Sequence, residues 1–316
     1  MAGSNASNKV VFAALAGNAL IAVTKFAASA VTGSSAMLSE AIHSLVDTGN
    51  QALLLLGMRR AAKPADSQHP FGYGMELYFW AFVVAILLFA LGAGVSVYEG
   101  IDKLRFPHHV SNPHINFIVL GIAMVLEGAA WAVAFRQFRK QKGARGYLEG
   151  VPHSKDPAVF VVLFEDTAAV LGLIAAFIGI ALSIHFGNSL FDAAAAIVIG
   201  IILAITALFL ALECKGLLIG EGASGAVVSG AKNIVEAHPG ILAVNELLTM
   251  HLGPEDILLN ISIDFSDELT SGGVERAISD LERQIKEAFP AIKRLFIEAQ
   301  SVTGHQSARA GSDKDA

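Results

Sequence analysis

The sequence predicts an α-helical membrane protein in which six transmembrane helices are followed by a small cytoplasmic α+β domain. Its 316 residues are 54% hydrophobic and only 16% charged, with a mean hydropathy of +0.57, whereas roughly 25% of the residues of a soluble domain are charged. Six apolar segments reach about 20 residues, the length that a helix needs to cross ~30 Å of hydrocarbon. From Gly222 onward, alternating and amphipathic patterns replace these apolar runs.

The six predicted spans form a domain over residues 10–215, after a short N-terminal tail at 1–9. We place them at residues 10–32, 35–57, 76–99, 114–135, 158–184 and 189–212. Lysine and arginine gather in the loops after the second and fourth spans, and such loops stay on the cytoplasmic side. We therefore expect both termini in the cytoplasm. We also expect no cleaved signal peptide and the bacterial inner membrane as the host.

The soluble domain is expected over residues 222–302. A helix is predicted at 224–237 and an amphipathic helix at 272–288, where apolar residues recur every three or four positions. Residues 257–265 alternate between apolar and polar side chains, which is typical of a half-buried strand, and a last strand is expected at 295–299. The order αββαβ predicts a ferredoxin-like domain with helices on one face of a sheet. The small, polar residues 303–316 are expected to be a disordered tail.

The second span carries two ionisable residues that point to a cation site. His43 and Asp47 are four residues apart, so their side chains lie one above the other on one helix face, close enough to share a cation. A carboxylate in the middle of a membrane span costs ~2.5–3.5 kcal/mol, and such residues normally face a polar cavity or an ion path. The alternative is that His43 and Asp47 only hydrogen-bond each other inside the bundle.

The fifth span contains a second acidic pair, Glu165 and Asp166. Adjacent residues on a helix point about 100° apart, so we expect one of them to face the cation site and the other to face a neighbouring helix. The alternative for Glu165 is an ion pair with Lys25 of the first span.

Glu127 lies near the middle of the fourth span, where a carboxylate is costly. Three roles are open for it: a metal ligand, a proton relay, or a counter-charge for Lys25.

The loop between the second and third spans contains Asp66 and His69, with Tyr73 four residues further on. These side chains could bind a metal ion, although two ligands are few for a tight site. The alternative is a structural turn, which the neighbouring proline and glycines favour.

Several function classes lack their sequence signatures. No GxxxxGK[ST] motif is present, which argues against a nucleotide partner, and no basic cluster indicates nucleic-acid binding. The single cysteine, Cys214, excludes an internal disulfide and a cysteine-based metal cluster within one chain. No GxSxG motif or substrate-positioning motif is found, so we expect no enzyme.

The sequence resembles the cation diffusion facilitator family along nearly its whole length. The stretch GSSAMLSEAIHSLVDTGNQALLLLG, followed by HPFGYGMELYFW, is specific to this family. Its sequence is most similar to that of the branch containing the mitochondrial-type zinc transporters. The resemblance implies a proton-coupled exporter of divalent metals, usually zinc, that forms a homodimer and has a cytoplasmic metallochaperone-like domain.

The resemblance also implies an intramembrane site with two ligands four residues apart in each of two spans. His43 and Asp47 match the first pair, and Asp166 matches the last ligand. Val162 stands where relatives with a full site have histidine or aspartate, so a fourth ligand has to come from elsewhere. The candidates are Glu165, Glu127, Gln51, another residue of a neighbouring span, or water. The resemblance also implies a metal site in the loop between the second and third spans. Asp66 and His69 match two of its ligands, and Tyr73 replaces a histidine ligand. The zinc-binding cluster that relatives have in the C-terminal soluble domain is largely absent from this sequence.

Together these features predict a carrier that binds a divalent cation at His43, Asp47 and Asp166 and exchanges it for protons. Mixed nitrogen and oxygen ligands suit zinc, with manganese, iron, cobalt and nickel as further candidates. Protons can compete with metal because a histidine must be neutral to bind it. The alternative function is a membrane scaffold or metal sensor that keeps a degenerate site and does not transport.

Overall fold

The computed structural model describes residues 18–107, 110, 112–142 and 157–312, so the predicted tail at 1–9 and the start of the first span lie outside the described residues. The chain divides into two compact units. One contains Met1–Ala62 and Glu76–Lys215, and the other contains Lys63–Met75 and Gly216–Ala316. The loop at 63–75, which the predicted boundaries assign to the membrane domain, therefore groups with the C-terminal unit.

The first unit is a bundle of long helices. After a helix at Asn18–Thr32 come α2 (Ser35–Ala61), α3 (Glu76–Leu87), a π-helical turn η1 (Leu88–Ala93), α4 (Gly94–Arg105), α5 (Pro113–Lys142), α7 (Pro157–Phe186) and α8 (Leu190–Leu218). The segments α3, η1 and α4 form one continuous helix. Within the part of the chain that the structure describes, four helices are long and apolar enough to cross a membrane: Glu76–Arg105, Pro113–Arg136, Phe160–Phe186 and Leu190–Leu218. The unit is therefore a multi-pass membrane domain.

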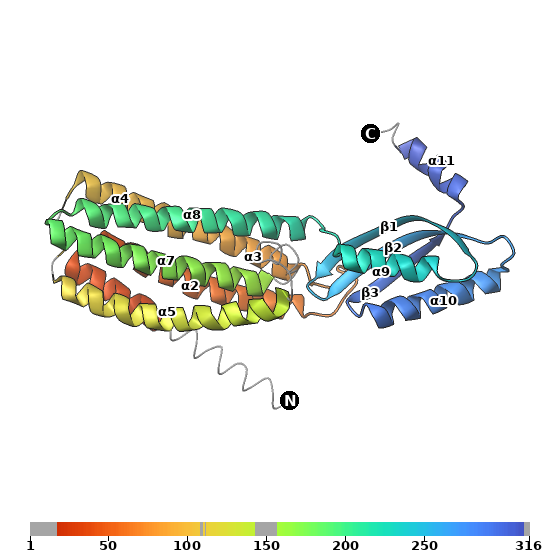
Figure 1. Ribbon diagram of the computed structural model, residues 1–316, viewed down its shortest axis with the longest axis horizontal. Coiled ribbons are helices and arrows are strands. Elements are labelled where there is room, and N and C mark those ends of the chain that lie inside the picture. Colours follow the sequence, from red (N-terminus) through yellow and green to blue (C-terminus); the bar gives the residue numbers. More distant parts are fainter. Residues whose placement is uncertain (1–17, 108–109, 111, 143–156, 313–316) are drawn as a thin grey trace, which may run out of the picture. The chain divides into compact units, whose positions relative to one another are not determined.

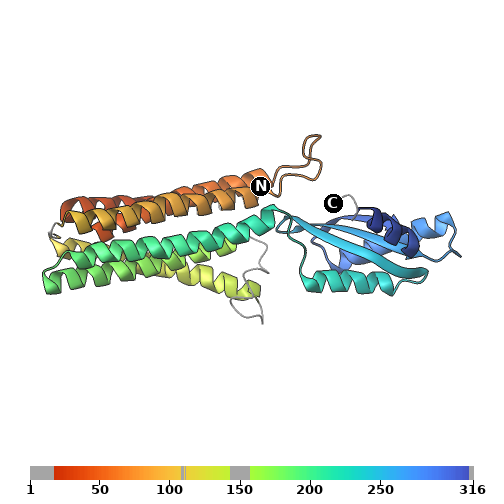
Figure 2. The same ribbon diagram turned by 90° about the horizontal axis from the view of Figure 1, so that it is seen from above.

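Helix α2 lies at the centre of the packing. It contacts α3, η1, α4 and α7, and α5 in turn packs against α7; Figures 1 and 2 show these long helices side by side. Glycines permit the closest approaches. A Cβ atom at Gly100 of α4 would lie 2.8 Å from the carbonyl oxygen of Ala193 in α8, so these two backbones can meet only because the side chain is absent.

The second unit has the predicted order αββαβ, with α9 (Gly225–Glu236), β1 (Ile241–Gly253), β2 (Asp256–Phe265), α10 (Ser271–Ala288) and β3 (Ile292–Ala299). The sheet order is β1-β2-β3, with β1 antiparallel and β3 parallel to β2. The alternation seen in the sequence has the expected result: Leu259, Ile261 and Ile263 are buried together with Leu281 and Ile285 of α10. The predicted fold of this domain is confirmed.

The prediction of a disordered tail is wrong for residues 303–312, which belong to helix α11 (Val302–Ser312). Ser301 precedes the helix, and its hydroxyl accepts a hydrogen bond from the backbone N–H of Gly304, as an N-cap residue does. The backbone N–H of Val302 donates to Asp264 of β2. These contacts depend on the folded sheet, so the polar composition of the segment alone did not reveal the helix.

Candidate functional site

The first predicted ligand pair lies on one face of α2. His43 Nδ1 is 3.4 Å from Asp47 Oδ1, and the exposed fractions of the two side chains are 1% and 18%. Neither ring nitrogen of His43 has a hydrogen-bond partner, and the same is true of Asp47 Oδ1. The alternative that the two side chains only hydrogen-bond each other is therefore not what the structure contains. They are close, buried and unsatisfied, which is costly for polar groups unless another group binds them.

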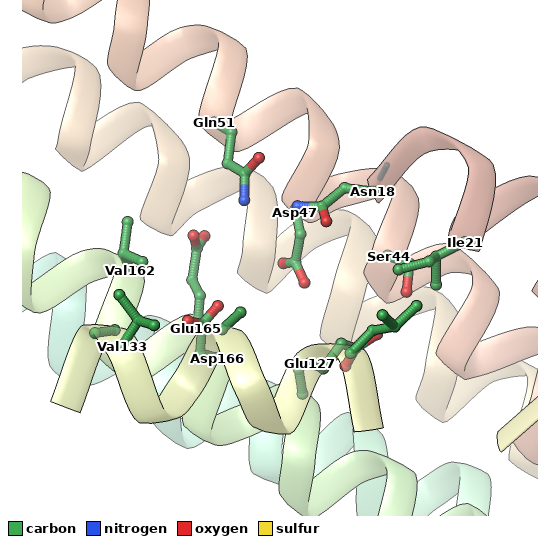
Figure 3. A pocket seen from close by; sticks show the side chains of 14 residues that line it. Asn18, Ile21, Ser44, Asp47, Gln51, Glu127, Val133, Val162, Glu165 and Asp166 are labelled. Atoms are coloured by element: carbon green, nitrogen blue, oxygen red, sulfur yellow. The ribbon is translucent and has the colours of Figure 1, made fainter. Parts of the chain in front are cut away.

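A cavity of about 390 Å³ lies beside Asp47, between the helix at Asn18–Thr32, α2, α5 and α7. Figure 3 shows Asp47, Glu127, Glu165 and Asp166 around it. Its lining residues come from all four helices: Asn18, Ile21, Ser44, Asp47, Gln51, Leu126, Glu127, Ala130, Val133, Ala134, Val162, Glu165, Asp166 and Ala169. His43 lies one turn before Asp47 and does not line the cavity. Four carboxyl groups from three helices thus meet at one buried space.

Both acidic residues of α7 line the cavity, so the expectation that only one of them faces the site is wrong. The cavity is wide enough to be reached from two adjacent helix positions. Glu165 also contacts a neighbouring helix, because its Oε1 accepts a hydrogen bond of 2.6 Å from Asn50 Nδ2 of α2. The proposed ion pair between Glu165 and Lys25 is not formed.

Lys25 instead binds two other carboxylates. Its ammonium group donates to Glu40 Oε2 at 3.0 Å, to Glu127 Oε1 at 2.8 Å and to Ser44 Oγ at 2.8 Å. Of the three roles considered for Glu127, the counter-charge for Lys25 is the one observed directly. Glu40 was not expected as a partner of Lys25, although a glutamate within the predicted second span was a signal that it needed a counter-charge.

The four cavity carboxylates are spread around the wall rather than clustered. Among the residues that the structure describes, no three histidine, cysteine, aspartate or glutamate side chains are close enough together to hold a metal ion. The predicted set of His43, Asp47 and Asp166 is therefore split: the two aspartates line the same cavity, and His43 lies behind one of them. Val162, at the position of the missing ligand, also lines the cavity.

The loop residues Asp66 and His69 lie outside the bundle and are organised by hydrogen bonds. Asp66 accepts bonds from the Tyr73 hydroxyl at 2.6 Å and from the backbone N–H groups of His69 and Gln68. These bonds hold the pKa of the Asp66 carboxyl below its ordinary value. His69 Nδ1 is 3.6 Å from Asp66 Oδ1. Since Asp66 already accepts three protein donors, the geometry favours the structural turn over a metal site.

Comparison with known proteins gives matches along most of the chain. A family model described as the cation efflux transmembrane domain matches residues 11–219. The chain is 34% identical over 287 residues to the proton-coupled zinc antiporter SLC30A9, mitochondrial, of Xenopus laevis, which covers 89% of this chain and 51% of that protein. It is 28% identical over 265 residues to metal tolerance protein C4 of Arabidopsis thaliana, which covers 83% of this chain and 58% of that protein.

A bacterial protein matches along nearly its whole length. The cation-efflux pump FieF of Escherichia fergusonii is 26% identical over 284 residues, which is 90% of this chain and 89% of the pump. By contrast, the chain spans only about half the length of the Xenopus and Arabidopsis relatives.

Proposed function

The chain belongs to the cation efflux family, and from that premise we propose that it exports divalent cations, zinc first, in exchange for protons. Members of this family are transporters rather than enzymes. The relatives that match the chain are named as a proton-coupled zinc antiporter and as a cation-efflux pump, which supports both the class of cargo and the direction.

One observation carries the proposal: Asp47, Glu127, Glu165 and Asp166 reach one cavity from three helices. Largely buried carboxylates attract cations strongly, because bulk water and salt screen them less than they screen carboxylates at the surface. Since the carboxylates come from α2, α5 and α7, relative motion of these helices changes the geometry around a bound ion. A site of this kind suits alternating access, in which the ion is bound in one arrangement and released in another.

We assign Asp47 and Asp166 as oxygen ligands of the cargo, with His43 as a nitrogen ligand. His43 Nδ1 lies 3.4 Å from Asp47 Oδ1, and neither ring nitrogen has a hydrogen-bond partner, so no hydrogen bond holds the ring away from the cavity. Glu127 and Glu165 are the candidates for the fourth ligand. A histidine with two or three carboxylates suits zinc, and a site with more oxygen ligands would also accept manganese, iron, cobalt or nickel. Protons compete for the same ligands.

The arrangement in the membrane is part of the proposal. We propose six spans, with the helix at Asn18–Thr32 and α2 added to the four strongly apolar ones. The basic residues after α2 and α5 support a cytoplasmic position of both termini, and residues 222–302 then form a cytoplasmic domain. The match to a bacterial efflux pump over 89% of its length supports the bacterial inner membrane as host, whereas the names of other relatives point to mitochondria.

We further propose that the protein works as a homodimer through its C-terminal domain. Two large apolar side chains of the sheet, Leu248 of β1 and Phe296 of β3, are more than half exposed, and both are paired in register with Asn260 of β2. Exposed apolar side chains on either side of Asn260 give the sheet a surface that a second copy can cover.

The test is metal flux in proteoliposomes under an imposed pH gradient, with zinc, manganese, iron, cobalt and nickel supplied in turn. We expect zinc flux that stops when the pH gradient is collapsed. Asp47→Ala should abolish it. Thr48→Ala is the matched control, because Thr48 is the next residue of α2 but does not line the cavity, and this variant should transport like the wild type.

Two results would count against the proposal. Near-normal zinc flux in Asp47→Ala would remove Asp47 from the mechanism. If the wild-type protein carries none of the five metals, the chain is better explained as the scaffold or sensor, an explanation that Val162 at the fourth ligand position already favours.

A further inference from the structure

Lys25 is a fully buried cation next to the cavity, and all its donors are used. An ammonium group has three N–H donors, and here they bind Glu40, Ser44 and Glu127 at 3.0, 2.8 and 2.8 Å. Its side chain has no exposed surface. A lysine bound in this way has a fixed position, because each movement would leave a buried charge or a buried hydrogen bond unpaired.

Glu40 binds Lys25 without bordering the cavity itself. Its side chain is fully buried, and it does not line the cavity. A Cβ atom added at Gly172 of α7 would overlap Glu40 Oε1, so this oxygen lies directly against the glycine. Glu40 is therefore confined between α7 and Lys25, and it anchors the ammonium group.

Glu127 is shared between Lys25 and the cavity. Its Oε1 accepts the bond from Lys25, whereas its Oε2 has no hydrogen-bond partner. The side chain is 16% exposed and lines the same cavity as Asp47 (Figure 3). One oxygen is thus held in place, and the other is available to a ligand.

The charges favour a cation at this free oxygen. Lys25 offsets the charge of only one of its two carboxylate partners, Glu40 and Glu127, so this group of three residues retains one negative charge. A divalent cation in the cavity would meet a carboxylate whose orientation is already set, which reduces the entropy lost on binding.

We propose that Lys25 is a positioning residue for the transported cation: anchored by Glu40, it orients Glu127 so that Oε2 becomes an oxygen ligand of the cargo. This inference rests on the proposed transport function. It assigns Glu127 as the ligand that takes the place of the one missing at Val162, and Glu40 as a residue that acts only through Lys25.

The experiment compares three variants by zinc flux and by calorimetric zinc binding to the purified protein. Lys25→Gln combined with Glu40→Gln removes both of these charges without changing the net charge. Glu127→Gln removes the proposed ligand, and the triple variant removes all three groups. Groups that support a metal ligand typically contribute 10–100-fold to affinity, so we expect the double variant and Glu127→Gln each to weaken zinc binding about tenfold.

The pattern of the effects separates positioning from general destabilisation. If Lys25 acts through Glu127, the triple variant binds zinc no more weakly than Glu127→Gln alone, and the KM for zinc rises while kcat stays within about twofold. Glu40→Gln alone keeps the bond between Lys25 and Glu127, so it should change the affinity less than the double variant does. Unchanged affinity in the double variant, or a triple variant whose loss is the product of the two separate losses, would overturn the inference.

A second variant covers the case in which the double variant does not fold. Gly172→Ala changes no cavity residue, but its methyl group displaces Glu40 Oε1 and so disturbs the anchor of Lys25. We expect weaker zinc binding in Gly172→Ala, and Gly172→Ala combined with Glu127→Gln should bind zinc no more weakly than Glu127→Gln alone. Wild-type affinity in a folded Gly172→Ala variant would contradict the inference, whereas absence of flux in the wild type would contradict the proposed function instead.

Discussion

A second buried ion pair, between Lys103 of α4 and Asp192 of α8, offers the sharpest test of the bundle's energetics. Lys103 Nζ lies 2.7 Å from Asp192 Oδ2 and also donates to the carbonyl oxygen of Gly33 at 2.7 Å. Asp192 in turn accepts from Ser34 Oγ at 2.6 Å and from the backbone N–H of Ser35 at 2.8 Å. The exposed fractions of the two charged side chains are 1% and 0%. The pair therefore joins α4 and α8 to the start of α2, where Ser34 is the N-cap residue.

We expect Asp192→Asn to destabilise the bundle by ~3–5 kcal/mol, because it leaves the ammonium group of Lys103 buried without a counter-charge. Lys103→Met combined with Asp192→Asn buries no charge at all, so this double variant should lose less than Asp192→Asn alone. The free energy of unfolding is measured by titrating SDS into mixed micelles and following helix content by circular dichroism. Asp102→Asn is the control, since Asp102 precedes Lys103 on α4 and is only half-buried.

The result that would refute this reasoning is a double variant whose loss of stability equals the sum of the losses in Lys103→Met alone and Asp192→Asn alone. Additive losses would mean that Lys103 and Asp192 contribute independently. An Asp192→Asn variant that unfolds at the same SDS fraction as Asp102→Asn would likewise show that the pair is not important for stability.

Three further predictions concern the cavity and the loop. Val162→His adds a donor to the cavity wall and should tighten zinc binding about tenfold, or ~1.4 kcal/mol, by calorimetry; unchanged affinity would mean that position 162 does not reach the ion. Asn50→Ala removes the hydrogen bond to Glu165 and should raise the KM for zinc severalfold in the flux assay; an unchanged KM would show that Asn50 does not position Glu165. Tyr73→Phe removes the hydrogen bond from the Tyr73 hydroxyl, which is the largest cause of the lowered pKa of Asp66. The stability that Asp66 contributes is present above its unfolded pKa and is lost as the pH falls through its lowered folded pKa. In Tyr73→Phe the folded pKa should rise, so this loss should occur at higher pH; NMR titration of the Asp66 carboxyl measures that pKa, and an identical titration in the variant would refute the prediction.

The C-terminal domain could be predicted well because its surface and core differ in polarity. Alternation in β2 and the three-to-four periodicity of α10 each identify a buried face, and these faces are found where the pattern puts them. On the other face of β2, Asn260 is exposed, whereas Ser262 is buried. Helix α11 was missed because its start depends on tertiary contacts with Asp264 and on the Ser301 cap. Those bonds have no counterpart in a local pattern of small and polar residues.

The packing of the membrane bundle could not be predicted in the same way, because its helices are apolar on nearly every side. Periodicity therefore does not tell which face of a helix meets which neighbour. On α2 the spacing alone separates two polar faces: Glu40 with Ser44, and His43 with Asp47, about 60° apart at 100° per residue. What the spacing could not tell is that Glu40 and Ser44 bind Lys25, and that one residue from each face, Ser44 and Asp47, lines the cavity. That choice depends on where the long side chain of Lys25 ends, and it makes Glu40 an anchor while Asp47 stays free for a cation. Two carboxylates seven residues apart on one helix thus acquire different roles from their neighbours, and the double variant of Lys25 and Glu40 should separate those roles in zinc affinity.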